Sequence, residues 1–181
     1  MKVVIDACVL FPTVLRELVL GVADTGAFQP LWSARILEEW RRAALRHGER
    51  DGEIAGVEIA LLSSRFLGAS IKVQPETEAR LTLPDPDDVH VFAAAVDGGA
   101  DELLTVNTRD FPINALGAED ILRRQPDEFL LEHLTGDQTG VRAVVDTVLA
   151  RAKSHGIDTT NRRALLKKAR VPKFAKALDQ G

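Results

Sequence analysis

The feature that most constrains the fold is the alternation of short apolar segments with longer segments of helical periodicity. KVVID at residues 2–6 and ELLTV at residues 102–106 are typical of buried strands, and SIKVQP at residues 70–75 predicts another. Helical patterns cover residues 13–23, 34–47, 54–67 and 86–96. Because strands that alternate with helices favour a parallel sheet, we predict an α/β/α sandwich with a mostly parallel central sheet.

The C-terminal third changes character. After a short edge strand over ILRR, the chain becomes helical in PDEFLLEHL, breaks at TGDQTG, continues as VRAVVDTVLARAKSHG and ends in a basic helix. We place the domain boundary at this break. Residues 1–134 are then the α/β domain, and residues 135–181 are a basic C-terminal helical extension.

Composition limits the classes of protein that fit. The net charge is −4, yet residues 151–181 carry nine Lys or Arg against two acidic residues, so an acidic body precedes a basic tail. Apolar stretches fall short of the roughly 18 to 20 residues of a membrane span, and no cationic, apolar leader is visible. A single cysteine, Cys8, excludes an internal disulfide, and the four histidines lack zinc-site spacing. We therefore expect a cytoplasmic protein without a membrane partner.

Polar residues follow two of the predicted strands at their carboxyl ends. Asp6 ends the first strand, and Asn107 and Asp110 follow ELLTV, in which Thr105 offers a hydroxyl. The carboxyl ends of parallel strands share one edge of the sheet, where ligands of open α/β folds bind. Taken alone, Asp6 could equally cap the next helix.

The segment LPDPDD contributes further acids. Asp85 has the position of a helix N-cap and Asp87 lies in the first helical turn, which gives both a structural interpretation. Asp88 differs because helical periodicity places it beside Val91 and Phe92, on the face that should enter the core. A carboxylate there must be paired, protonated or bound to a cation.

The helix SARILEEWRRAAL separates two adjacent glutamates. Ser33 is its expected N-cap, Glu39 lies at the margin of the apolar arc, and Glu38 lies on the opposite side. Glu39 can therefore lean toward a site. The alternative is an exposed Glu39 paired with Arg42 or Arg46 at helical spacing.

Four carboxylates from separate segments, Asp6, Glu39, Asp88 and Asp110, are thus expected to converge as catalytic and metal-binding residues. Without compensation they would repel one another, and Mg²⁺ or Mn²⁺ relieves this because both prefer carboxylate oxygens. Asn107 can add an amide oxygen or orient a water but supplies no charge, which favours one tightly held cation. Such ions support hydrolysis of phosphodiesters.

Four segments in this order, VVIDACVLFP, SARILEEW, DPDDVHVFAAAVDGGAD and LLTVNTRDFP, resemble the PIN-domain ribonucleases, particularly the VapC toxins. They lie within residues 2–112, and PDEFLLEHL resembles the continuation in one subgroup. The resemblance implies a PIN-like fold and a Mg²⁺-dependent endoribonuclease that acts as the toxin of a type II toxin–antitoxin pair. It also implies a homodimer and a cognate antitoxin that covers the acidic site, often on promoter DNA. Asn107 stands where many members of the family carry an acid.

The basic tail suits an RNA substrate. Lys167, Lys168 and Arg170 could contact phosphates, although a solvated helical face is the alternative. Two other functions stay open: an inactive PIN-like module that binds RNA or protein, and a phosphotransfer protein or phosphatase. The second is weaker because a haloacid-dehalogenase-like phosphatase needs an acid where Cys8 stands, and a receiver needs paired early acids and a late lysine.

Overall fold

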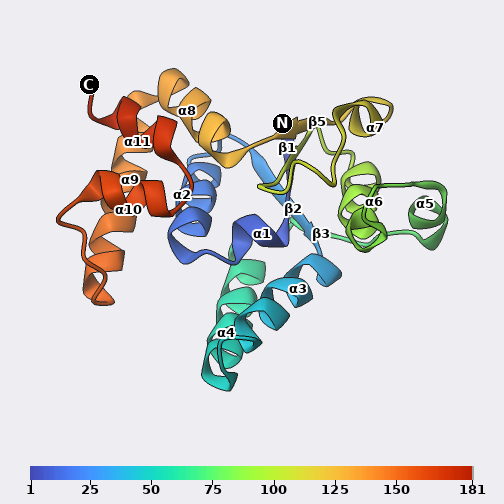
Figure 1. Ribbon diagram of the computed structural model, residues 1–181, viewed down its shortest axis with the longest axis horizontal. Coiled ribbons are helices and arrows are strands. Elements are labelled where there is room, and N and C mark those ends of the chain that lie inside the picture. Colours follow the sequence, from blue (N-terminus) through green and yellow to red (C-terminus); the bar gives the residue numbers. More distant parts are fainter. Residues whose placement is uncertain (181) are drawn as a thin grey trace. The chain divides into compact units, whose positions relative to one another are not determined.

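The computed structural model describes residues 1–180 and contains a five-stranded sheet of order β3-β2-β1-β4-β5 (Figure 1). β1 pairs in parallel with both β2 and β4, and β2 pairs in parallel with β3. The predicted α/β fold with a parallel central sheet is therefore confirmed. The strands are β1 (Lys2–Ile5), β2 (Gln29–Ser33), β3 (Ser70–Ile71), β4 (Glu102–Leu104) and β5 (Leu122–Arg124).

The chain forms two compact units. The first comprises residues 1–11 and 29–123, and the second comprises residues 12–28 with the chain from Arg124 onward. All of the predicted acidic site residues belong to the first unit. The boundary placed between residues 134 and 135 stays a prediction, because compactness does not test which segments fold independently.

Helices of the first unit support the sheet and carry the site. α6 packs against β1, β2, β3 and β4, while α3 packs against β2, α1 and α4. Phe92 and the three alanines that follow it are buried in α6. The helices are α1 (Ala7–Leu10), α3 (Ala34–Leu45), α4 (Glu49–Arg65), α5 (Pro75–Arg80), the 3₁₀ turn η1 (Pro86–Asp88), α6 (Val89–Gly98) and α7 (Ile113–Gly117).

The helix ends beside the site form as their sequence signals predict. Ser33 accepts a hydrogen bond from the Ile36 N–H at 3.2 Å and so caps α3. Asp85 accepts from the Asp87 N–H at 2.9 Å, which starts η1 and leads into α6. α6 ends at Gly98, and Gly99 adopts the left-handed conformation at φ +57°. By fixing where α3 and η1 begin, these caps fix the positions of Glu39 and Asp88 along them.

The predicted start of α4 is wrong. The helix begins at Glu49 rather than at residue 54 and contains Gly52 in its first part. A Cβ at Gly52 would overlap the side chain of Leu45 at the end of α3. Close packing of α3 on α4 therefore outweighs the low helix propensity that made this segment resemble a loop.

The predicted strand over residues 70–75 is too long. β3 covers only Ser70–Ile71, and the helix α5 follows, which the sequence analysis did not anticipate. Asp97 of α6 accepts hydrogen bonds from the Gln74 N–H and from the Thr77 hydroxyl, both at 2.7 Å. A side chain distant in sequence thus anchors the start of α5, and no local pattern reveals it.

The second unit is helical, as predicted for the C-terminal part of the chain. α2 packs against α8 and α9, and α11 packs against α8 and α10. The expected single basic helix is instead two, because Arg170 adopts φ +65° and Pro172 starts a new helix. None of the helices in residues 1–180 is both long and apolar enough to cross a membrane. The helices are α2 (Thr13–Asp24), α8 (Pro126–Gly136), α9 (Gln138–Ser154), α10 (Arg162–Lys168) and α11 (Pro172–Leu178).

The turn after α6 gives a first testable prediction. Gly99→Ala should lower the free energy of unfolding by about 1 kcal/mol, because a side chain at φ +57° is strained. Gly117→Ala is the matched control, since Gly117 ends α7 with open space around its Cα. Urea unfolding should show Gly117→Ala unchanged or slightly stabilised, and equal effects at the two positions would contradict the assignment.

Candidate functional site

The site begins where β1 and β4 end side by side. Ile5 and Leu104 are partners in the parallel register, and the Asp6 N–H donates to the Leu104 carbonyl at 3.0 Å. Asp6 and Thr105 are consequently the next residues at the same edge of the sheet. Both are buried, with Asp6 5% exposed.

Two neutral donors hold one oxygen of Asp6. Its Oδ2 accepts from the Thr105 hydroxyl at 2.6 Å and from the Cys8 thiol at 3.0 Å. Burial, with the adjacent charge of Asp6, raises the pKa of the Cys8 thiol to about 12, so the thiol keeps its proton. The Thr105 hydroxyl also accepts from the Asn107 N–H at 2.9 Å, which ties the following loop to Asp6.

The loop after β4 is anchored at its far end. Arg123 Nη1 donates to the carbonyls of Thr108 and Phe111 at 2.7 and 2.9 Å, and the Phe111 side chain is fully buried. Asp110 lies between these two carbonyls in the chain. Its position is therefore set by backbone anchoring rather than by helix or strand periodicity.

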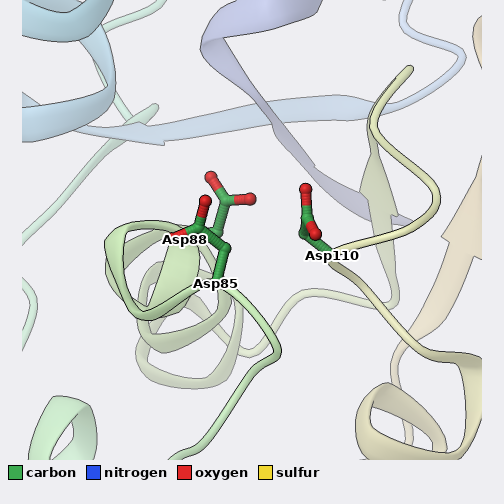
Figure 2. A group of neighbouring side chains, drawn as sticks. All are labelled: Asp85, Asp88 and Asp110. Atoms are coloured by element: carbon green, nitrogen blue, oxygen red, sulfur yellow. The ribbon is translucent and has the colours of Figure 1, made fainter.

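Three carboxylates come together around this loop. Asp85, Asp88 and Asp110 each offer one ligand atom within 4.8 Å of the other two. Figure 2 shows their carboxyl groups extending to the same side, two from the start of the α6 segment and one from the loop after β4. Among the described residues this group contains neither Asp6 nor Glu39.

Asp88 lies at the electrostatic centre of a wider cluster. Burial raises the pKa of its carboxyl to about 6, and the charges of Asp6, Asp85, Asp110 and Glu39 add to the effect in that order. Every one of these causes disfavours the ionised form. The other three predicted carboxylates, Asp6, Glu39 and Asp110, therefore lie close enough to Asp88 for their charges to act on it.

Asn107 faces Asp88 through its amide nitrogen. Nδ2 donates to Asp88 Oδ2 at 3.0 Å, so the side chain orients Asp88 without adding a positive charge. Whether Asn107 also ligates a cation stays a prediction. Its backbone and side chain together connect Asp88 to the hydroxyl that holds Asp6.

The two adjacent glutamates of α3 lie on different sides, as their helical phase predicts. Glu38 accepts from Arg41 at 2.8 and 2.9 Å and from Arg42 at 2.9 Å. Hydrogen bonds from these two arginines lower its pKa to about 2. Glu39 instead lies 2.7 Å from Nε2 of the buried His90 and 3.9 Å from Arg35.

Three residues of the site, Asp85, Cys8 and His90, were not among those selected from the sequence. Asp85 caps η1 as predicted but is also one of the three clustered carboxylates. Cys8 and His90 carried no signal, because a lone thiol and a histidine on an apolar helix are usual core residues. Lys167, Lys168 and Arg170 are exposed in the second unit, and their role in RNA binding stays a prediction.

The raised pKa of Asp88 predicts how stability depends on pH. A carboxyl whose pKa is about 6 when folded, against the ordinary 3.8, favours the folded state only while protonated. The metal-free protein should therefore lose stability as the pH rises from 3.8, the ordinary pKa, through about 6, the pKa in the folded state. Asp88→Asn should raise the free energy of unfolding at neutral pH by about 1–2 kcal/mol, a range reduced because the side chain is partly exposed.

The measurement is urea unfolding with a chelator present, at neutral pH and at about pH 4, where the gain should vanish. Asp87→Asn is the matched control, because Asp87 is an exposed neighbour outside the cluster. It should change stability by less than about 0.5 kcal/mol. A destabilised Asp88→Asn at neutral pH would show that the cluster does not strain the fold.

Comparison with known proteins identifies the family. A family model described as PIN domain matches residues 2–109, more than half of the chain. One curated relative, named "Putative ribonuclease VapC50", from Mycobacterium tuberculosis (strain ATCC 25618 / H37Rv), is 40% identical over 58 residues, which is 32% of this chain. The chain spans about a third of that relative's length, 34%. No solved structure matches significantly. With its parallel sheet and with Asp6, Glu39, Asp85 and Asp88 inside the matched segment, the chain belongs to the PIN domain family.

Proposed function

We propose that this protein is a metal-dependent endoribonuclease and the toxin of a type II toxin–antitoxin pair. The observation that carries the proposal is the convergence of four other carboxylates on Asp88 at the carboxyl edge of the sheet. Repulsion between the carboxylates of such a cluster destabilises the folded protein unless a cation is bound. A nuclease is the function that explains why the chain keeps it.

The donor set suits Mg²⁺ or Mn²⁺. Asp85, Asp88 and Asp110 would hold the ion, with Asp6 and Glu39 completing the negative field. Carboxylate oxygens are the ligands these hard cations prefer, and the protonated Cys8 thiol is a poor ligand by comparison. The predicted catalytic residues Asp6, Glu39, Asp88 and Asp110 are part of this proposal.

The chain's own residues prepare the acids for this task. When bound, the cation would offset charge on the phosphodiester and make water more acidic. Thr105 and Cys8 hold the Asp6 carboxylate through its Oδ2. Asn107 orients Asp88 in the same way. These neutral donors fix carboxylate positions without cancelling the charge that attracts a cation.

RNA and an antitoxin are the proposed partners. The name of the matched relative supports a ribonuclease of the VapC group, within the limits of a partial match. An antitoxin that covers the acidic edge, promoter DNA bound through that complex, a homodimer and a cytoplasmic location complete the proposal. The protein purified without its antitoxin should then cleave RNA without any other protein.

The adjacent glutamates of α3 provide the sharpest test. Glu39→Gln should lower the rate of Mg²⁺-dependent RNA cleavage about tenfold or more, because it removes a charge from the cluster. Glu38→Gln is the matched control and should cleave like the wild type, since Glu38 pairs with Arg41 and Arg42 instead. Cleavage of labelled single-stranded RNA, with and without chelator, measures both.

Asp6→Asn should abolish cleavage in the same assay while the protein stays folded, as judged by circular dichroism. Wild-type rates in Asp6→Asn, or activity that persists in chelator, would reject the metal-dependent mechanism. Metal binding without RNA cleavage would instead favour a PIN-like binding module. Release of phosphate from small phosphoesters would favour the phosphatase alternative.

The basic tail predicts the salt dependence of RNA binding. Replacement of Lys167, Lys168 and Arg170 by Gln should weaken binding and flatten the plot of log affinity against log salt concentration. Each lost phosphate contact should remove about 0.7 from the slope for single-stranded RNA. Fluorescence anisotropy over a salt series measures it, and an unchanged slope would assign these residues to a solvated surface. Cleavage at saturating RNA should persist.

A further inference from the structure

The buried histidine beside the site has no role in the mechanism proposed above. His90 is 1% exposed and is the second residue of α6, which begins directly after Asp88. Among residues 1–180, neither of its ring nitrogens has a hydrogen-bond partner. Buried polar groups are seldom left in this state, because the loss of hydration is not offset.

Glu39 is the carboxylate in contact with this ring. Its Oε1 lies 2.7 Å from His90 Nε2, although the contact lacks the geometry of a hydrogen bond. The contact joins α3, which carries Glu39, to α6, which begins directly after Asp88. Glu39 also lies close enough to Asp88 for its charge to act there.

A second basic side chain, Arg35, also approaches Glu39. Arg35 Nε is 3.9 Å from the same Oε1, one helical turn away. Arg35 is itself engaged, because its Nη1 donates to Glu78 at 3.0 Å and its Nη2 approaches the Asp87 carbonyl at 3.5 Å. Glu39 thus lies near both a solvent-exposed arginine and a buried imidazole.

We propose that His90 is a positioning residue that holds the Glu39 carboxylate toward the acidic cluster, so that Glu39 contributes to cation binding. Residues outside the ligand shell act in this way when they restrict the rotamers of residues that face the metal. This inference rests on the proposed function. It assigns a role to His90, a residue that would touch neither the cation nor the RNA.

The test is Mn²⁺ affinity, measured by calorimetry without RNA. His90→Leu should weaken Mn²⁺ binding about tenfold or more, which is the usual effect of removing such a partner. His90→Gln should restore most of the affinity, because a carboxamide N–H can replace Nε2–H beside Glu39. His47→Leu is the matched control, since His47 is exposed and stacks on Phe11. It should bind Mn²⁺ like the wild type.

A double-mutant cycle separates positioning from a structural effect. In a Glu39→Gln background, His90→Leu should weaken Mn²⁺ binding no further, because its target is gone. Circular dichroism checks that each variant is folded, and His90→Phe keeps a ring in place if His90→Leu does not fold. Unchanged affinity in the folded His90 variants, or an equal loss in the Glu39→Gln background, would overturn the role of His90.

The two proposals fail in different ways. A wild-type protein that binds Mn²⁺ but cleaves no RNA would reject the nuclease and leave the His90 result standing. Normal Mn²⁺ affinity in the His90 variants would reject the positioning role alone. A wild-type protein that binds no Mn²⁺ would reject the metal site, and the positioning role with it.

Discussion

The parallel pairing of β1 with β4 is the constraint on which the site depends. The register places Ile5 beside Leu104, and the Asp6 backbone continues the ladder for one more bond. Because successive side chains of a strand alternate in direction, a slip of one residue would turn Asp6 away from Thr105. The position of one carboxylate is thus decided by hydrogen bonds between strands roughly a hundred residues apart in the sequence.

The environment of the cluster leaves most of its negative charge uncompensated. Its side-chain hydrogen-bond donors are a hydroxyl, a thiol and an amide, from Thr105, Cys8 and Asn107. Arg35 donates to Glu78 and approaches only the margin of the cluster, where it lies 3.9 Å from Glu39. A salt bridge would neutralise the charge that attracts a cation. Neutral donors instead fix the positions of the carboxylates and leave their negative charge in place. This is the kind of local strain that functional sites retain at the expense of stability.

Much of this arrangement could be predicted where the signal is local. Capping residues located the starts of α3 and α6, and helical phase separated Glu39 from Glu38. Phase could not select His90, because α6 is buried on nearly all sides and every position looks like core. Asp85 satisfied its capping pattern, which hid its second role in the cluster. The division of the chain into units was equally hidden, since packing between distant segments leaves no local pattern.

The grouping of α2 with α8 and α9 has a consequence for synthesis. α2 leaves the ribosome early, but the helices that pack against it follow roughly a hundred residues later. All residues of the sheet-containing unit are available before then, because that unit ends at Arg123. Domains generally fold as their residues emerge. The apolar side of α2 therefore cannot reach its packing partners until the C-terminal helices have been synthesised, long after α2 itself.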